Sequence, residues 1–74
     1  MKVYVKPCGP VAMRLNRSGE VEVMDGISLL DLKQELGLPR NYPVLYAVNG
    51  TNAPQETLLH NGDNVTIINI VSGG

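Results

Sequence analysis

The sequence predicts an α+β domain in which a mixed sheet of four or five strands packs on one helix. Two strand patterns precede a single helix pattern and three more strand patterns follow it, an order that favours a sheet covered by one helix. The helix pattern is too short to be stable alone in water, so it needs a sheet to pack against. The chain contains no repeat, linker or low-complexity stretch. We therefore expect one domain at residues 1–71 and a flexible tail at residues 72–74.

The first half of the chain contains two segments in which apolar and polar residues alternate. Residues 1–6 and residues 20–24 both show this period of two, which predicts strands with one buried face. Between them, residues 10–19 fit a short strand or a single helical turn equally well. Met13 and Met24 are expected to fill gaps in the core, because methionine adapts its shape readily.

The helix pattern follows the second predicted strand. Ser28 is a good N-cap residue, and Gly37 is suited to end a helix because it tolerates positive φ. Lys33 is expected to point away from the core. The apolar face of the helix consists of three leucines at helical spacing, Leu29, Leu32 and Leu36.

Three further strands are predicted in the second half of the chain. Residues 44–48 form a nearly continuous apolar run, as expected of a central strand covered on both faces. The Asn-Gly pair at 49–50 predicts a two-residue type I′ hairpin, which needs positive φ at both positions. A short edge segment is expected at 51–54 and one helical turn at 56–59. A clear strand pattern then covers 65–71.

Composition excludes several classes of function. The formal net charge is −1 and the six basic residues are dispersed along the chain, so the concentrated cationic face used to bind nucleic acid is missing. No apolar run approaches the roughly 20 residues that span a bilayer, and the first residues lack the apolar core of a signal peptide. We expect a cytoplasmic protein that binds neither nucleic acid nor membranes.

The isolated cysteine, histidine and aspartate side chains fit structural roles better than catalytic or metal-binding ones. Cys8 is the only cysteine, so no internal disulfide can form, and we interpret it as a small buried apolar residue. His60 has no second histidine or cysteine with which to hold a metal. Asp63 follows a glycine and is expected to form turn hydrogen bonds. We therefore predict no metal site and no bound cofactor.

The C-terminus is the strongest candidate for a reactive group. Gly73 and Gly74 follow the last predicted strand closely, and residues without a Cβ let backbone approach backbone in a narrow channel. The terminal carboxylate is ionised at neutral pH and is a poor electrophile. Reaction with ATP would give an acyl adenylate from which a sulfur donor could displace AMP. The sequence has no phosphate-binding Gly-x-x-x-x-Gly-Lys-Ser/Thr loop, so a partner enzyme must use the ATP.

Several of these segments together resemble the ThiS/MoaD sulfur-carrier family. The matching residues include an Asn-Gly pair, a Gly-Asp pair and the final Gly-Gly, within residues 48–50, 58–59, 61–68 and 71–74. The resemblance implies a ubiquitin-like β-grasp fold and a carrier protein that is not itself an enzyme. It implies that Gly74 is adenylated and then carries a thiocarboxylate. Gly73 precedes it and has no side chain, so this part of the chain fits a narrow channel.

The same resemblance implies three kinds of partner protein. An E1-like adenylating enzyme would activate the chain, a sulfur donor protein would supply sulfur, and an acceptor synthase would receive it. The acceptor is a thiazole synthase if the pathway makes thiamin. In molybdopterin biosynthesis it is the large subunit of a synthase in which this chain is the small subunit. The sequence leaves the pathway open.

Alternation in the last strand predicts where a partner docks. If Val65 and Ile67 face the helix, then Ile68 and Ile70 face away from it, beside the tail. Exposed apolar residues next to a reactive end suit a protein interface. We predict partner binding by Ile68, Ile70, Val71 and Ser72, and the alternative is that both faces of the strand are covered within this chain.

Two other functions fit the same sequence. A protein modifier would form an amide between Gly74 and lysines of other proteins, since an amine can capture an acyl adenylate as sulfur does. A plain interaction domain would carry an incidental diglycine, and deletion of Gly73 and Gly74 would leave its function intact.

Overall fold

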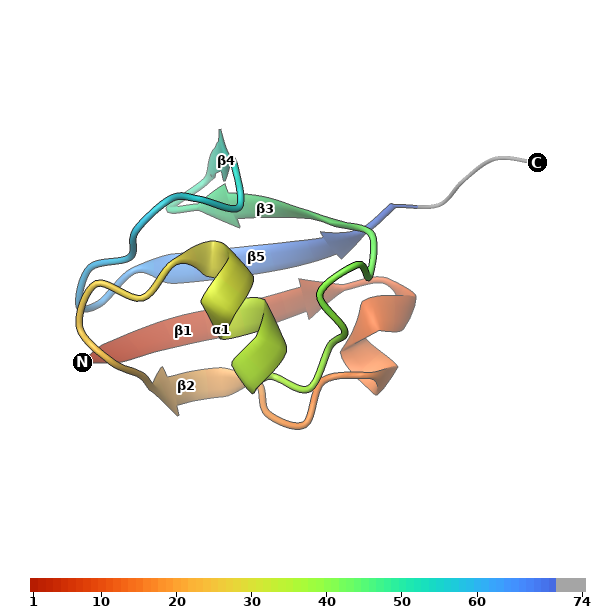
Figure 1. Ribbon diagram of the computed structural model, residues 1–74, viewed down its shortest axis with the longest axis horizontal. Helices are drawn as coiled ribbons and strands as arrows, with labels where there is room; N and C mark the ends of the chain where they lie inside the picture. The colour runs from red at the N-terminus through yellow and green to blue at the C-terminus, as the bar shows by residue number, and fades with distance from the viewer. Residues whose placement is uncertain (71–74) are drawn as a thin grey trace.

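The computed structural model describes residues 1–70 of the chain and shows one helix packed on a five-stranded mixed sheet (Figure 1). The strands lie in the order β2-β1-β5-β3-β4; β1 and β5 are parallel, and the other neighbours are antiparallel. This arrangement confirms the predicted α+β class and is a ubiquitin-like β-grasp. The elements in chain order are β1 (Lys2–Cys8), the 3₁₀ turn η1 (Pro10–Met13), β2 (Gly19–Glu22), α1 (Leu29–Glu35), β3 (Val44–Val48), β4 (Thr51–Ala53) and β5 (Asn64–Asn69).

The core lies between α1 and one face of the sheet. The two central parallel strands supply residues that are almost fully buried, and α1 covers them with its leucines. Val5 of β1 is opposite Val65 of β5, while Ile67 of β5 is opposite Tyr46 of β3. A slip of one residue would turn this whole set to the other face, so burial of one face specifies the register.

The predicted ends of the helix are confirmed. The Ser28 Oγ accepts a hydrogen bond from the Asp31 backbone N–H at 3.1 Å, which satisfies one of the unpaired donors of the first turn. At the other end Gly37 has φ +91°, and its N–H donates to the Gln34 carbonyl at 3.0 Å. A Cβ at residue 37 would also come within 3.1 Å of Asn16 Nδ2.

The hairpin between β3 and β4 is the two-residue turn that the sequence predicts. Asn49 and Gly50 have φ values of +52° and +84°, and Val48 pairs directly with Thr51. Positive φ at both positions is the signature of a type I′ turn, whose twist matches that of the strands it joins.

The prediction that two methionines fill the core is wrong. Met13 is 91% exposed and Met24 is 76% exposed. Residues 10–18 form η1 and a loop that leads into β2. Val11 occupies the inward position of η1 without any exposure. Met24 follows the buried Val23, so the alternation of the chain turns it outward.

Two predicted elements of the second half also differ in the structure. Residues 56–59 form a turn and an isolated bridge to Ser28 rather than a helical turn, because the Leu29 N–H donates to the Thr57 carbonyl and the Leu59 N–H to the Ile27 carbonyl. The last strand ends at Asn69 and not at residue 71.

Strand β3 is covered on one face only, contrary to the prediction for residues 44–48. Tyr46 is buried under α1, whereas Leu45 on the opposite face is 56% exposed. The single short helix covers one side of the sheet, and within residues 1–70 no element covers the other side. Among these residues, no helix is long and apolar enough to cross a bilayer.

Candidate functional site

Strand β5 carries the chain toward its C-terminus from the middle of the sheet. It lies between β1 and β3, and its far end lies at the opposite end of the molecule from Met1 (Figure 1). The predicted reacting residues Gly73 and Gly74, and the predicted contact residues Val71 and Ser72, lie outside the described residues. The structure therefore defines the candidate site up to Ile70.

The face of the sheet away from α1 carries apolar side chains beside the end of β5. Cys8 pairs with Ile68, and Ile68 pairs with Leu45, so these three residues form one row across three strands. Leu45 is 56% exposed and Ile70 43%, whereas Ile68 and Cys8 are half-buried. We call Cys8, Leu45, Ile68 and Ile70 the open-face patch.

Sequence reasoning identified two of these four residues and missed the other two. Leu45 lies in an apolar run that predicts coverage of both faces, although its alternation with the inward Tyr46 carries the signal for exposure. Cys8 was interpreted as buried, but the structure extends β1 to this residue and gives it a half-buried place on the sheet surface. Leu45 and Cys8 lie next to Ile68 only because β3 and β1 pair with β5 in the folded chain.

On the helix side, a polar network surrounds the same end of β5. Lys33 was expected to point outward, yet it is only 3% exposed, because it lies four residues after Leu29 on the buried face of α1. Its Nζ donates to the Arg40 carbonyl at 2.8 Å and to the Tyr42 carbonyl. Burial lowers the pKa of Lys33 from its ordinary value. The Tyr42 Oη in turn donates to Asn69 Oδ1 at 3.4 Å.

Comparison with known families identifies the type of protein. A model described as the ThiS family matches residues 11–74. The chain belongs to the ThiS family. It is thus a small ubiquitin-like sulfur carrier or modifier. Such ThiS-type proteins are carriers, not enzymes themselves, and they work with E1-like activating enzymes and sulfur-transfer partners.

Solved structures agree with this assignment at the level of the fold. The crystal structure of SAMP1 from Haloferax volcanii is similar to this ThiS-family chain, with 19% sequence identity, a TM-score of 0.71 and coverage of 100% of both chains. At this identity the likeness shows a shared β-grasp fold. No curated protein matches the chain.

In this ThiS-family chain, the Asn-Gly pair at residues 49–50 and the Gly-Asp pair at residues 62–63 lie close together at the start of β5. The Asp63 Oδ2 accepts the His60 backbone N–H at 2.8 Å, and its Oδ1 accepts the Asn49 Nδ2 at 3.0 Å. The Asn49 Oδ1 accepts the Asn64 N–H at 2.9 Å. The hydrogen bond from the His60 N–H is the main reason that the pKa of Asp63 lies below its usual value. These contacts confirm Asp63 as a turn residue and give the two motifs a structural role.

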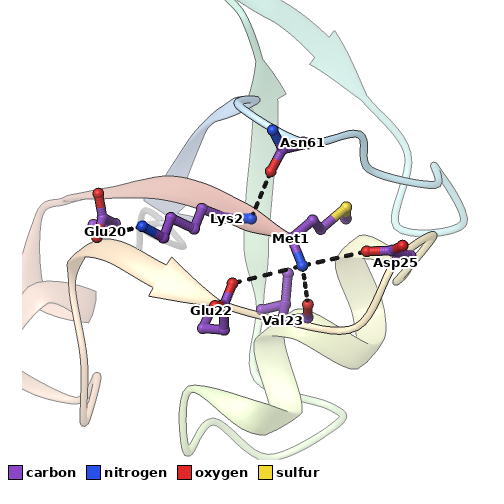
Figure 2. Close-up of polar contacts among 7 residues, drawn as sticks. All are labelled: Met1, Lys2, Glu20, Glu22, Val23, Asp25 and Asn61. Atoms are coloured by element: carbon purple, nitrogen blue, oxygen red, sulfur yellow. Dashed lines mark hydrogen bonds and ion pairs between the residues drawn. The ribbon is translucent and has the colours of Figure 1, made fainter.

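The N-terminus is held at the same end of the molecule (Figure 2). The Met1 ammonium donates to the Val23 carbonyl at 2.9 Å and forms ion pairs with Asp25 at 3.2 Å and Glu22 at 3.5 Å. The Lys2 backbone N–H donates to Asn61 Oδ1 at 2.8 Å. These contacts fix the first strand to its neighbours at the end remote from the open-face patch.

The described residues contain a shallow hollow but no arrangement typical of catalysis. The hollow, of about 570 Å³, lies between α1 and the loop after β2. Carboxylates line it without a histidine, cysteine or lysine, and within residues 1–70 no three acidic, histidine or cysteine side chains are placed to hold a metal. The lining residues are Met24, Asp25, Gly26, Ile27, Asp31, Gln34 and Glu35.

Proposed function

We propose that this chain is a sulfur carrier whose Gly74 carboxylate is activated and then sulfurated by partner proteins. The carboxylate attacks the α-phosphate of ATP in the active site of an E1-like enzyme, and pyrophosphate leaves. Hydrosulfide (HS⁻) supplied by a donor protein then attacks the acyl carbon. A C–S bond forms, the C–O bond to AMP breaks, and loss of the S–H proton to solvent leaves a thiocarboxylate on Gly74. The observation that supports this proposal is the family match, which continues through Gly73 to residue 74.

In this proposal the reacting end and the surface that a partner recognises are different parts of the chain. Gly73 and Gly74 enter the partner's active site, and Val71 and Ser72 connect them to the sheet. The open-face patch docks on the partner, since burial of exposed apolar surface is the main favourable term in protein association. Leu45 and Ile70, its most exposed members, contribute most to this contact.

The sulfur is delivered to a synthase in cofactor biosynthesis, either for the thiazole of thiamin or for molybdopterin. The chain binds no cofactor of its own in this scheme, because the partner binds ATP. Protein modification is the second candidate, since the acyl adenylate that sulfur attacks is equally open to attack by a lysine amine. The two candidates share the activation step and differ in the nucleophile.

Activation can be tested with a variant extended by one glycine beyond Gly74. The assay is ATP–pyrophosphate exchange catalysed by the E1-like enzyme of the same host, with the unmodified chain as reference. We expect exchange with the unmodified chain and none with the extended one, because the reactive carboxylate is displaced from the α-phosphate. Equal exchange by the untrimmed extended chain would contradict the proposal.

A further inference from the structure

Lys33 is a buried cation that the proposed function leaves unused. Its side chain is 3% exposed, and a buried ammonium is costly unless its N–H groups are paired. Within residues 1–70 its partners are the Arg40 and Tyr42 carbonyls and no carboxylate. Lys33 therefore ties α1 to the loop between α1 and β3.

The same loop contacts the last residue of β5. The Tyr42 Oη donates to Asn69 Oδ1 at 3.4 Å, and the Ile70 N–H donates to the Pro43 carbonyl at 3.4 Å. From the other side, Gly9 lies next to Asn69, since a Cβ at residue 9 would make an ordinary van der Waals contact of 3.6 Å with the Asn69 Cβ. The end of β5 is thus held between two loops at the residue where the chain leaves the sheet.

Asn69 is a polar residue on the side of β5 that otherwise carries buried apolar side chains. By alternation it faces the same side as Val65 and Ile67, which are fully buried. Here that side chain accepts a hydrogen bond instead, from a loop that the buried Lys33 anchors. A hydrogen bond favours particular directions, and even this long one restrains the side chain more specifically than apolar packing in the same place would.

We propose that Lys33, Tyr42 and Asn69 form a positioning relay that sets the direction of the backbone at Ile70, where the chain leaves β5. The inference rests on the proposed function and deepens it. The open-face patch determines how tightly the partner binds. The relay determines the orientation of the chain at the end of β5 in the complex. Because misplacement of a reacting group by about 1 Å can cost up to a hundredfold in rate, loss of the relay lowers kcat of adenylation while KM changes little.

The test compares Tyr42→Phe with Asn61→Ala. Tyr42→Phe removes only the hydroxyl that contacts Asn69. Asn61→Ala is the matched control, because it removes the 2.8 Å hydrogen bond from the Lys2 N–H, beside Met1 (Figure 2) and so remote from the end of β5. Lys33→Met, which removes the donors and keeps the length of the side chain, is the second relay variant. The readouts are amide hydrogen exchange at Ile70 in the isolated chain, and kcat and KM in ATP–pyrophosphate exchange.

We expect both relay variants to speed exchange at Ile70 by about three- to tenfold, the effect of one hydrogen bond, and to lower kcat by a similar factor. Asn61→Ala should leave both values unchanged. Unchanged Ile70 exchange and kcat in Tyr42→Phe, or equal changes in Asn61→Ala, would overturn the relay. If the unmodified chain is not adenylated at all, the proposed function fails, and the exchange data still decide whether the relay restrains Ile70.

Discussion

The two ends of β5 are held in different ways. At its start, the side chains of Asn49 and Asp63 make hydrogen bonds of 2.8 to 3.0 Å that join two turns to the strand. At its end, the contacts from Tyr42 and Ile70 to their acceptors both measure 3.4 Å. Short bonds at one end stabilise the fold, and long bonds at the other restrain the chain more weakly. The difference fits a strand whose start stabilises the fold and whose end, under the proposed function, leads to the C-terminus that a partner activates.

The largest effect should come from deletion of Gly73 and Gly74. We expect complete loss of activation by the E1-like enzyme with no change in thermal stability, because neither residue adds a side chain to the core. Pyrophosphate exchange and a melting curve measure the two quantities. Activation of the shortened chain at the rate of the unmodified one would show that the diglycine is incidental.

At the start of β5, Asp63→Ala should destabilise the fold without a specific effect on activation. It removes two hydrogen bonds to a carboxylate that is 13% exposed, which should lower the free energy of unfolding by roughly 2 kcal/mol. Urea unfolding measures the change. Glu56→Ala is the control, because within residues 1–70 that exposed carboxylate has no hydrogen bond or ion pair, and its effect should be close to zero.

The same carboxylate makes stability depend on acid pH. The pKa of Asp63 is lower in the folded chain than its ordinary value of 3.8, so the unfolded chain binds more protons between the two values. The free energy of unfolding therefore falls as pH drops from about that value through the folded pKa. Urea unfolding at several pH values should show this loss in the unmodified chain and a smaller one in Asp63→Ala. Parallel pH profiles would refute the assignment.

At the end of β5, Ile70→Ala should weaken docking and leave folding intact. Ile70 is 43% exposed, so the side chain is available to a partner, and its loss should cost about 1 kcal/mol of binding, or about a fivefold rise in KM. Met13→Ala is the matched control, because Met13 is also apolar and exposed but lies outside the open-face patch. An equal rise in KM for both variants would show that the patch is not the interface.

Acetylation of the Met1 amine should have the smallest effect. It removes the charge that pairs with Glu22 and Asp25, whose side chains are largely exposed, and exposed ion pairs contribute about 0–1 kcal/mol. We expect a decrease in unfolding free energy of about 0.5 kcal/mol at low salt that vanishes at high salt. A loss that persists at high salt would show that the hydrogen bond to Val23 is what matters.

The fold could be predicted because its determinants are local. The spacing of three leucines, the cap at Ser28 and the positive-φ pair at 49–50 each specify their own element. The exposure of individual side chains was harder to predict, since it depends on which other parts of the folded chain cover them. Met13 is exposed because Val11 fills the core beside it, and Leu45 because no second helix covers its face within residues 1–70.

The candidate site was predictable in part for the same reason. The choice of Gly74 as the proposed reactive residue and the outward side of β5 follow from the order and alternation of residues. The network around Asn69 could not be predicted from the sequence. Its members Lys33, Tyr42 and Asn69 come from α1, a loop and β5, and they meet only in the folded chain. The spacing of Lys33 from Leu29 places it on the buried face, yet its carbonyl partners have no sequence signal.

The central claim is tested most directly by intact-mass analysis of the chain after incubation with ATP, a sulfur source and extract of its own host. We predict a mass increase equal to replacement of one oxygen by sulfur, localised to Gly74 by fragmentation. An unchanged mass, with the host's activating enzyme shown to be present, would contradict the carrier function. Attachment of the chain to other proteins through Gly74, without a thiocarboxylate, would contradict it in favour of a protein modifier.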